Sequence, residues 1–147
     1  MQDLPHHYAV AAQTTGDGPV TLSSRGLDSL ESAGPVEFGG PGDLWSPETL
    51  LVAAVADCFV LSFQATARAA RFEWRNLRCD VEGTLERVDG ETRFTKFVQR
   101  VVLELPVGAD EARGRKLLAK AERSCLITNS LRGATELVLQ VEFGNGA

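Results

Sequence analysis

The sequence predicts an α+β domain in which a long apolar helix is enclosed by antiparallel strands. The first observation is residues 47–70, an Ala- and Leu-rich segment with no Gly and, beyond its first residue, no Pro. The second is the alternation of apolar and polar residues in 77–85, 97–105 and 137–143, the two-residue period of half-buried strands. The third is a length of 147 residues, which suits one hydrophobic core, so a single domain over residues 1–147 is expected.

The first elements expected along the chain are two short strands that form a β-hairpin. Residues 8–14 and 20–24 are β-prone, and Gly16-Asp17-Gly18-Pro19 between them supplies the backbone conformations of a tight turn. Residues 34–42 are rich in Gly and Pro, which indicates an irregular loop before the helix.

The long helix is expected to begin at Ser46-Pro47-Glu48. A Ser can cap the helix, a Pro suits its first turn, and a Glu favours the positive end of its dipole. Its middle, LLVAAVADCFVL, is apolar on nearly every side, with Asp57 as the one interruption. Such a helix must be covered by a sheet or by other helices. The apolar run is too short for a bilayer span, so no membrane contact is expected.

The second half of the chain predicts another hairpin, a helix and a last strand. Residues 77–85 and 97–106 are expected to pair across the turn Asp89-Gly90. Residues 110–123 form an amphipathic pattern, and 137–143 a third half-buried strand. The predicted order is β-β-α-β-β-α-β, with two antiparallel hairpins and a C-terminal strand around the central helix.

Composition and charge exclude several classes of function. The net charge of -5 and the absence of a dense basic patch argue against nucleic acid as a partner. The only histidines are His6 and His7, and no Cys/His cluster has metal-ligand spacing, so no metal or other cofactor is expected. No signal peptide is visible, and three cysteines without a C-x-x-C motif fit a reducing cytoplasm.

The three cysteines are the remaining candidates for chemistry. Cys79 falls on the apolar phase of a predicted strand and is expected to be a small buried residue. Cys58 lies in the middle of the apolar helix, where burial makes a thiol inert unless a cation stabilises the thiolate, so the pattern alone favours a structural role. Cys125 follows the second helix in a loop with exposed character, a better setting for a reacting thiol.

Two motifs resemble those of the OsmC/Ohr family. The segment SPETLLVAAVADCF, residues 46–59, resembles the first family motif, in which Pro-Glu opens an apolar helix that ends in Cys-Phe. The segment AERSCLITNSL, residues 121–131, resembles the second, an Ala-Glu-x-x-Cys followed by Asn-Ser-Leu. The elements between the motifs also occur in the order of the family. The resemblance therefore covers nearly the whole chain.

The resemblance implies a peroxidase that reduces organic hydroperoxides. Cys58 would attack the peroxide and become a sulfenic acid, and Cys125 would close a disulfide with it. An external dithiol would reopen that disulfide, and family members related to Ohr use lipoyl groups for this step. An apolar pocket formed by Trp45, Phe59 and Phe63 would favour alkyl or lipid hydroperoxides, although these residues equally suit the core.

The family also places a Glu and an Arg beside the attacking thiol. Glu48 matches the family Glu, although its position equally suits a helix N-terminal carboxylate. The loop before the helix lacks the Arg that some relatives have, and Arg25, the only Lys or Arg in residues 1–67, is the one substitute upstream. On a straight helix the ten residues from Glu48 to Cys58 span about 15 Å. Both can therefore serve one site if the helix kinks or if a second chain contributes, and the apolar surface favours an intertwined homodimer with sites at the interface.

Two alternatives stay open from the sequence. A hotdog-like thioesterase also wraps strands around an apolar helix, and both Cys58 and Cys125 would then be incidental. A family member that has weak or no peroxidase activity, and that binds ligands or senses redox state, would explain the missing Arg.

Overall fold

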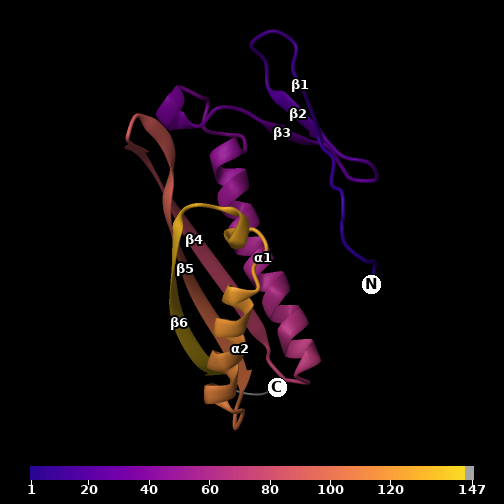
Figure 1. Ribbon diagram of the computed structural model, residues 1–147, viewed down its shortest axis with the longest axis vertical. Helices are drawn as coiled ribbons and strands as arrows, with labels where there is room; N and C mark the ends of the chain where they lie inside the picture. The colour runs from indigo at the N-terminus through magenta and orange to yellow at the C-terminus, as the bar shows by residue number, and fades with distance from the viewer. Residues whose placement is uncertain (145–147) are drawn as a thin grey trace. The chain divides into compact units, whose positions relative to one another are not determined.

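The computed structural model describes residues 1–144, while residues 145–147 lie outside the described residues. The chain divides into two compact units, residues 1–50 and residues 51–147, which are called unit 1 and unit 2 below. The single domain expected over residues 1–147 stays a prediction. Figure 1 shows the elements of both units in chain order.

Unit 1 contains a small antiparallel sheet of strands β1 (Ala11–Gln13), β2 (Val20–Ser23) and β3 (Leu30–Ser32), in that order (Figure 1). Strands β1 and β2 confirm the predicted hairpin. Strand β3 was not predicted, because three residues are too few to display an alternating pattern. A 3-10 turn, η1 (Val36–Phe38), follows in the Gly-rich segment.

Helix α1 (Pro47–Ala69) begins in unit 1 and continues through unit 2. Its start is fixed by a reciprocal cap. The Thr49 N–H donates to Ser46 Oγ at 3.1 Å, and the Ser46 N–H donates to Thr49 Oγ1 at 2.8 Å. This pair satisfies two backbone donors at the N-terminal end. The predicted helix is therefore confirmed at both ends within one residue.

Unit 2 is built on a three-stranded sheet in the order β4-β5-β6. Strands β4 (Asn76–Val88) and β5 (Glu91–Pro106) form the predicted hairpin, and Asp89 and Gly90 in its turn both have positive φ, as a type I′ turn requires. Strand β6 (Ala134–Gly144) pairs with β5 in parallel, because helix α2 (Glu111–Arg123) carries the chain back between them. A 3-10 turn, η2 (Thr128–Ser130), separates α2 from β6.

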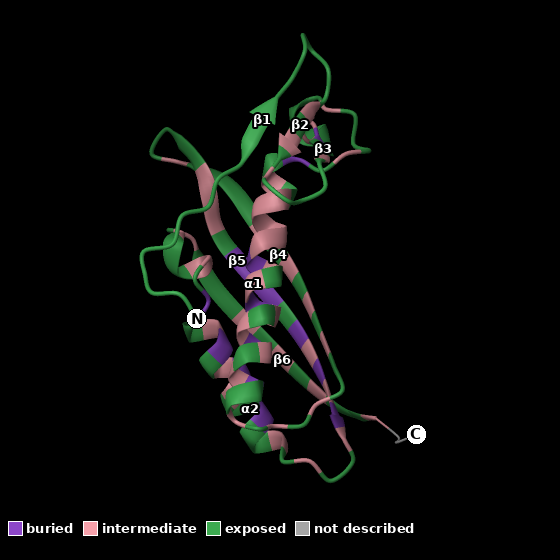
Figure 2. Ribbon diagram, turned by 90° about the vertical axis from the view of Figure 1, so that its right-hand side faces the viewer, coloured by how far each residue is buried: buried purple, intermediate pink, exposed green. Residues whose placement is uncertain are grey.

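The core of unit 2 lies between the sheet and the two helices. Figure 2 shows buried residues along the middle of β5 and along one stripe of α1. The predicted core face of β5 is confirmed, whereas Leu85 of β4 is exposed, because the pairing of β4 and β5 is irregular between Thr84 and Leu85 and the alternation ends there. The core cluster consists of Phe59, Phe63, Ala67, Val101, Leu103, Leu105, Leu118 and Ala121.

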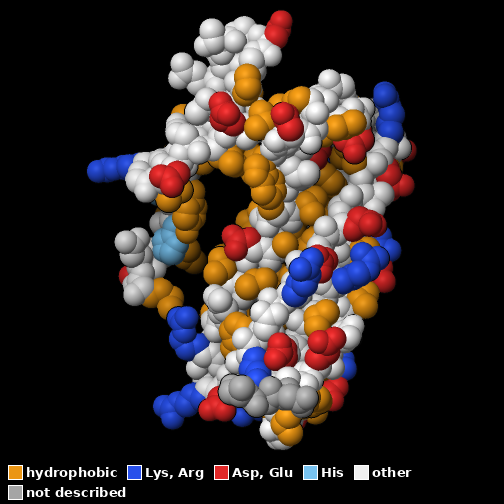
Figure 3. All heavy atoms as spheres, turned by 180° about the vertical axis from the view of Figure 1, so that it is seen from behind, with side chains coloured by type: hydrophobic (Ala, Val, Ile, Leu, Met, Phe, Trp, Pro, Cys, Tyr) orange, Lys and Arg blue, Asp and Glu red, His pale blue; other side chains and the backbone are white. Residues whose placement is uncertain are grey.

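The opposite face of the same sheet is charged. Exposed ion pairs lie on it, Arg78 with Asp80 along β4 at 2.8 Å and Lys96 of β5 with Glu136 of β6 at 2.7 Å. Figure 3 shows acidic and basic side chains next to one another on the side where these strands lie. Exposed pairs of this kind contribute little to stability. Their mixed signs place acidic and basic groups next to one another among the described residues of this face.

Helix α1 is apolar around most of its circumference, but only one stripe of it is buried, formed by Val55, Phe59, Phe63 and Ala67. The expectation that its apolar run is too short for a bilayer span is wrong, because the whole helix is long and apolar enough to cross a membrane by length and composition. The buried stripe accounts for 22% of its most apolar 18 residues. The stripe packs on the sheet of unit 2. Leu61, on another face, is 54% exposed. Much of the apolar surface of α1 is therefore left uncovered by the described residues of one chain.

Candidate functional site: two thiols beneath an apolar hollow

Cys58 lies in the middle of α1, at the edge of the buried stripe. Phe59 is completely buried, Cys58 is half-buried and Asp57 is exposed, so the surface of the helix changes from core to solvent across these three positions. The Cys58 Sγ lies 3.9 Å from Ser62 Oγ, one turn further along the helix. The sulfur is thus supported by the helix and still open to reagents from solvent.

Cys125 immediately follows the C-cap of α2, Ser124, and is 0% exposed. The exposed setting predicted for this thiol is wrong, because only its neighbours Ser124 and Leu126 are exposed. After the helix the chain coils into η2, and the Asn129 N–H donates to the Cys125 carbonyl at 3.1 Å. This turn leaves Ser124 and Leu126 at the surface while Cys125 is buried.

The structure brings the two predicted redox cysteines together. The Cys58 thiol lies close enough to Cys125 to help lower the pKa of the Cys125 thiol through a hydrogen bond, although 67 positions in the sequence separate them. Both are free thiols in this structure. A disulfide requires the two sulfurs to approach to about 2.0 Å. Two neighbouring thiols can meet that requirement by a local movement of their side chains.

The surroundings of Cys125 favour its thiolate. Burial disfavours the charge and alone would raise the pKa of this thiol. Hydrogen bonds from the hydroxyl and the N–H of Thr128, from the Cys58 thiol and from the Ile127 N–H outweigh burial, so the pKa of Cys125 lies below its ordinary value of 9.0. The donors at the start of η2 therefore act as a local anion site for the sulfur.

Cys79, the third cysteine, has the opposite character. It is half-buried in β4, where burial and, to a lesser degree, the charges of Asp80 and Cys125 raise the pKa of its thiol to about 11. A thiol with that pKa is almost entirely protonated at neutral pH and is a poor nucleophile. This agrees with the small buried residue that the sequence predicts.

A hollow of about 580 Å³ lies in unit 2 above the two thiols. Cys58 lines it, and Cys125 does not. Its wall is mostly apolar, and Asp57 is the only charged residue among those that line it in the described chain. The lining residues are Ala54, Asp57, Cys58, Leu61, Ser62, Ala65, Thr66, Ser124, Leu126 and Ile127.

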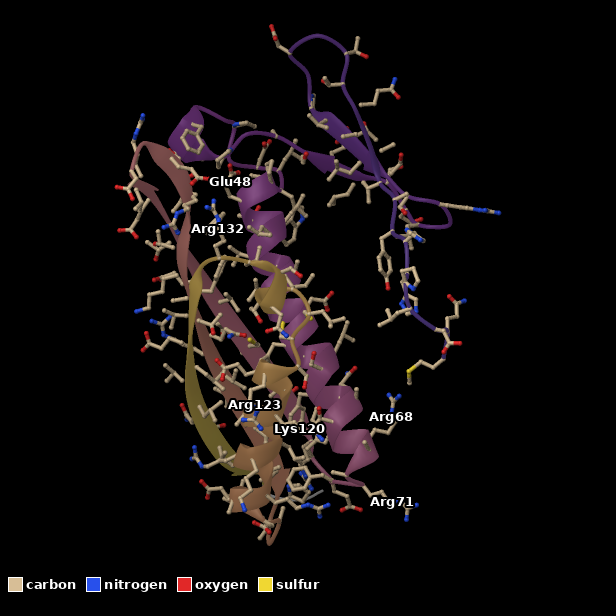
Figure 4. All side chains as sticks on the ribbon, in the orientation of Figure 1. Glu48, Arg68, Arg71, Lys120, Arg123 and Arg132 are labelled. Carbon is tan, nitrogen blue, oxygen red and sulfur yellow. The ribbon has the colours of Figure 1, made fainter. Side chains whose placement is uncertain are left out.

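The basic residues that are nearest in sequence to Cys58 and Cys125 lie outside the lining of the hollow. Figure 4 shows Lys120 and Arg123 on the last turn of α2, Arg68 on the last turn of α1 and Arg71 just after that helix. None of the four lines the hollow as the described residues form it. Within unit 2, therefore, hydrogen bonds rather than a cation in the wall of the hollow provide the electrostatic support for a thiolate.

The remaining predicted site residues divide between the two units. Arg25 and Trp45 are exposed residues of unit 1, and Glu48 lies in the first turn of α1. The Oε2 atom of Glu48 is buried and has no hydrogen-bond partner among the described residues. Phe59 and Phe63 are completely buried in the core of unit 2 and do not line the hollow. Their role in a substrate pocket stays a prediction, as do the roles of Arg25, Trp45 and Glu48.

Sequence reasoning missed the polar residues that support the two thiols. Ser62 lies four residues after Cys58, the spacing that places two side chains on one helix face. Thr128 lies three residues after Cys125, the spacing of one tight helical turn. Both spacings are visible in the sequence. They become informative only once Cys58 and Cys125 are known to react.

These features define an α+β protein with a pair of contacting cysteine thiols beneath an apolar hollow. A family model described as OsmC-like protein matches residues 40–140. The Bacillus subtilis protein YmaD, an uncharacterized protein, is 31% identical over 146 residues, which cover 96% of this chain and 97% of YmaD. The chain therefore belongs to the OsmC/Ohr family of OsmC-like proteins, as its two motifs predict. Membership of this family excludes the hotdog-like thioesterase that the sequence left open.

Solved structures of the same fold are similar over nearly their whole length. An organic hydroperoxide resistance protein OsmC from Legionella pneumophila is 24% identical with a TM-score of 0.73, and the match covers 95% of this chain and 99% of that one. An OsmC-like protein of unknown function from Vibrio cholerae is 21% identical with a TM-score of 0.78, covering 93% and 99%. At this level of identity the likeness shows the fold.

Proposed function

We propose that this protein is a thiol-dependent peroxidase that reduces organic hydroperoxides to alcohols. The observation that carries the proposal is the contact between the Cys58 and Cys125 thiols beneath an apolar hollow. Membership of a family that includes organic hydroperoxide resistance proteins supports it. The site would act in the cytoplasm, where thiols are kept reduced.

The reaction proceeds in three balanced steps. The Cys58 thiolate attacks the outer oxygen of ROOH, the O–O bond breaks, and the alkoxide takes a proton and leaves as ROH. The resulting Cys58 sulfenic acid reacts with the Cys125 thiol to give a disulfide and water. An external dithiol, such as a lipoyl group, then reduces the disulfide and is itself oxidised to a disulfide.

The hollow supports an alkyl or lipid hydroperoxide as the substrate. Residues such as Ala54, Leu61 and Ile127 give it an apolar wall. An alkyl chain gains free energy by leaving water for such a wall, whereas hydrogen peroxide has no apolar part to bury. Binding of the chain would hold the peroxide group above Cys58.

We also propose a homodimer with its sites at the interface. The uncovered apolar surface of α1, including the exposed side chain of Leu61, is suited to burial by a second copy. The buried and unpartnered Oε2 of Glu48 supports an arginine as its missing partner, with Arg25 as the candidate from the first half of the chain. Light scattering of the purified protein checks this. The expected mass is that of two chains, and a monomer would contradict a shared site.

A redox-sensing or ligand-binding family member is the second candidate. The observation that favours it is the hollow itself, since Asp57 is its only charged residue among the described ones and no cation faces Cys58 there. A sensor needs one oxidation per signal, whereas a peroxidase needs rapid turnover. Kinetics therefore separate the two candidates.

The deciding experiment is steady-state turnover of tert-butyl hydroperoxide with dithiothreitol. Wild type is expected to turn over, and Cys58→Ser to lose roughly 10³-fold or more in rate, because the attacking atom is absent. Cys79→Ser is the matched control, since it removes a thiol outside the pair, and it is expected to retain the wild-type rate. Equal rates for wild type and Cys58→Ser would retire Cys58 as the nucleophile and leave the sensor or binding protein.

A further inference from the structure

The two sulfurs of the site differ in how an external thiol can reach them. Cys58 lines the hollow and is half-buried. Cys125 is 0% exposed and is absent from the wall of the hollow, although Ser124 and Leu126 on either side of it are exposed. A reagent that enters the hollow therefore meets the sulfur of Cys58 first.

The two sulfurs also differ in the donors that face them. Hydrogen bonds from the Thr128 hydroxyl and from the N–H groups of Ile127 and Thr128 outweigh the burial of Cys125 and hold the pKa of its thiol below the ordinary value. The same hydroxyl lies 3.3 Å from the Cys125 carbonyl, to which it can donate while the sulfur is neutral. A hydroxyl proton can rotate to the stronger acceptor, which is the sulfur once it is charged. Cys58, by contrast, has Ser62 Oγ at 3.9 Å.

We propose that Thr128 is a positioning residue that makes Cys125 the leaving group when an external dithiol opens the disulfide, so that the dithiol attacks Cys58. The inference deepens the proposed function and rests on the formation of a Cys58–Cys125 disulfide. In thiol exchange the sulfur that is the more stable thiolate leaves faster. Accessibility and leaving-group stability thus select the same direction of attack.

The exchange balances in two steps. One thiolate of the dithiol forms a bond to the Cys58 sulfur, the Cys58–Cys125 bond breaks, and Cys125 departs with the electron pair as a thiolate held by Thr128. The second thiolate of the dithiol then attacks the dithiol sulfur that is bonded to Cys58, and Cys58 leaves as a thiolate. The dithiol ends as a cyclic disulfide, and Cys58 and Cys125 end reduced and take up the two protons that the dithiol lost.

Among the described residues, the titratable groups that interact with Cys125 are Cys58 and Cys79, and neither can replace Thr128. Cys58 approaches from α1 and is itself the sulfur under attack. Cys79 approaches from β4, and the pKa of about 11 keeps its thiol neutral at physiological pH. The charge that develops on Cys125 is therefore met mainly by the hydroxyl and backbone donors of the turn.

The test measures the reduction of a disulfide that is formed with diamide, so that the protein need not react with hydroperoxides. Dithiothreitol in excess is mixed with oxidised protein at pH 7, and thiol recovery is followed in time. Thr128→Val is expected to slow reduction roughly tenfold, since one hydrogen bond to a charged sulfur is lost. Thr128→Ser restores a hydroxyl and is expected to restore most of the rate.

The matched control is Ser130→Ala in the same turn. The Ser130 hydroxyl donates to the Leu126 carbonyl at 2.7 Å and is not among the donors to Cys125. Its removal weakens the turn without touching the sulfur, so wild-type reduction is expected. An equal loss in Ser130→Ala and Thr128→Val, or no rescue by Thr128→Ser, would overturn the role of Thr128.

The direction of attack is read separately by trapping. Oxidised protein is treated briefly with glutathione, quenched with acid and alkylating agent, and mapped by mass spectrometry. Glutathione is expected on Cys58, and glutathione on Cys125 would overturn the inference. Failure of diamide to join Cys58 and Cys125 would overturn it together with the proposed function. A diamide disulfide without peroxide turnover would contradict the proposed function alone.

Discussion

Cys79 is half-buried and Cys125 is completely buried, yet the pKa values of their thiols are shifted in opposite directions. Burial is the largest influence on each of them, and it raises the pKa of Cys79 to about 11. Cys125 is the more deeply buried of the two, and its pKa is nonetheless lowered. The difference teaches that burial by itself does not decide whether a thiol is inert. The donors available at the sulfur decide it.

The secondary structure around each sulfur explains which donors are available. Cys79 pairs with Val101 in the ladder of β4 and β5, where backbone N–H groups are committed to the neighbouring strand. Cys125 lies between α2 and η2, where the first N–H groups of a turn have no partner within the turn. Thr128 adds a hydroxyl to them. A helix-to-turn junction can therefore hold a buried thiolate that a strand cannot.

The largest effect expected from this comparison is that of removing Cys125. In Cys125→Ser the Cys58 sulfenic acid has no partner, so excess hydroperoxide should carry it to the irreversible sulfinic acid. Dimedone labelling and mass spectrometry should detect the sulfenic acid after one equivalent and the sulfinic acid after ten. In Cys79→Ser both products should stay near wild-type levels. Sulfinic acid at equal levels in the two variants would remove the distinction between the two thiols.

A direct titration of the two thiols sharpens the comparison. Thiolate absorbance at 240 nm can be followed in Cys58→Ser/Cys79→Ser, which retains only Cys125, and in Cys58→Ser/Cys125→Ser, which retains only Cys79. Cys125 is expected to ionise below 9.0 and Cys79 near 11. The reverse order of ionisation would show that donors in η2 do not control the charge.

The smallest effect is on stability at alkaline pH. The folded-state pKa of Cys79 is raised, so the stability that its neutral form contributes is complete below pH 9.0 and is lost as pH rises to about 11. Cys125 has a lowered pKa and acts in the opposite sense, because its contribution is present above pH 9.0 and is lost as pH falls through its folded-state pKa. Urea unfolding at pH 8 and pH 11 measures the sum.

Comparison with Cys79→Ala isolates the part that belongs to Cys79. The wild type should lose about 2 kcal/mol more than this variant between the two pH values. Tyrosine and lysine titrations are common to both proteins and cancel in the difference. Equal losses in the two proteins would mean that Cys79 ionises in the folded state as it does in the unfolded chain.

The sequence predicts most of the fold because its elements carry strong local signals. The composition and length of residues 47–70 and the capping residue Ser46 all predict a helix. The ends of that helix are confirmed within one residue. Strand β3 has three residues and gives no period to detect. The parallel pairing of β6 with β5 is a property of the α2 crossover, so alternation within 137–143 could not reveal it.

The candidate site is less visible in the sequence because it depends on two distant segments. Nothing in the local patterns brings Cys58 to Cys125, and only the resemblance to a family paired them. Cys125 is buried because the chain reverses after α2. The polar residues next to Cys125 in the sequence gave no sign of this burial. Phe59 and Phe63 carry the same apolar signal for a pocket or a core, and in the described chain they lie in the core.

The central claim is that Cys58 and Cys125 form one redox couple from which Cys79 is excluded. Peptide mapping of the protein after one equivalent of tert-butyl hydroperoxide tests it most directly. The expected result is a linked pair of peptides that contain Cys58 and Cys125, with Cys79 recovered as a free thiol. Three free thiols, or a disulfide that includes Cys79, would contradict the account.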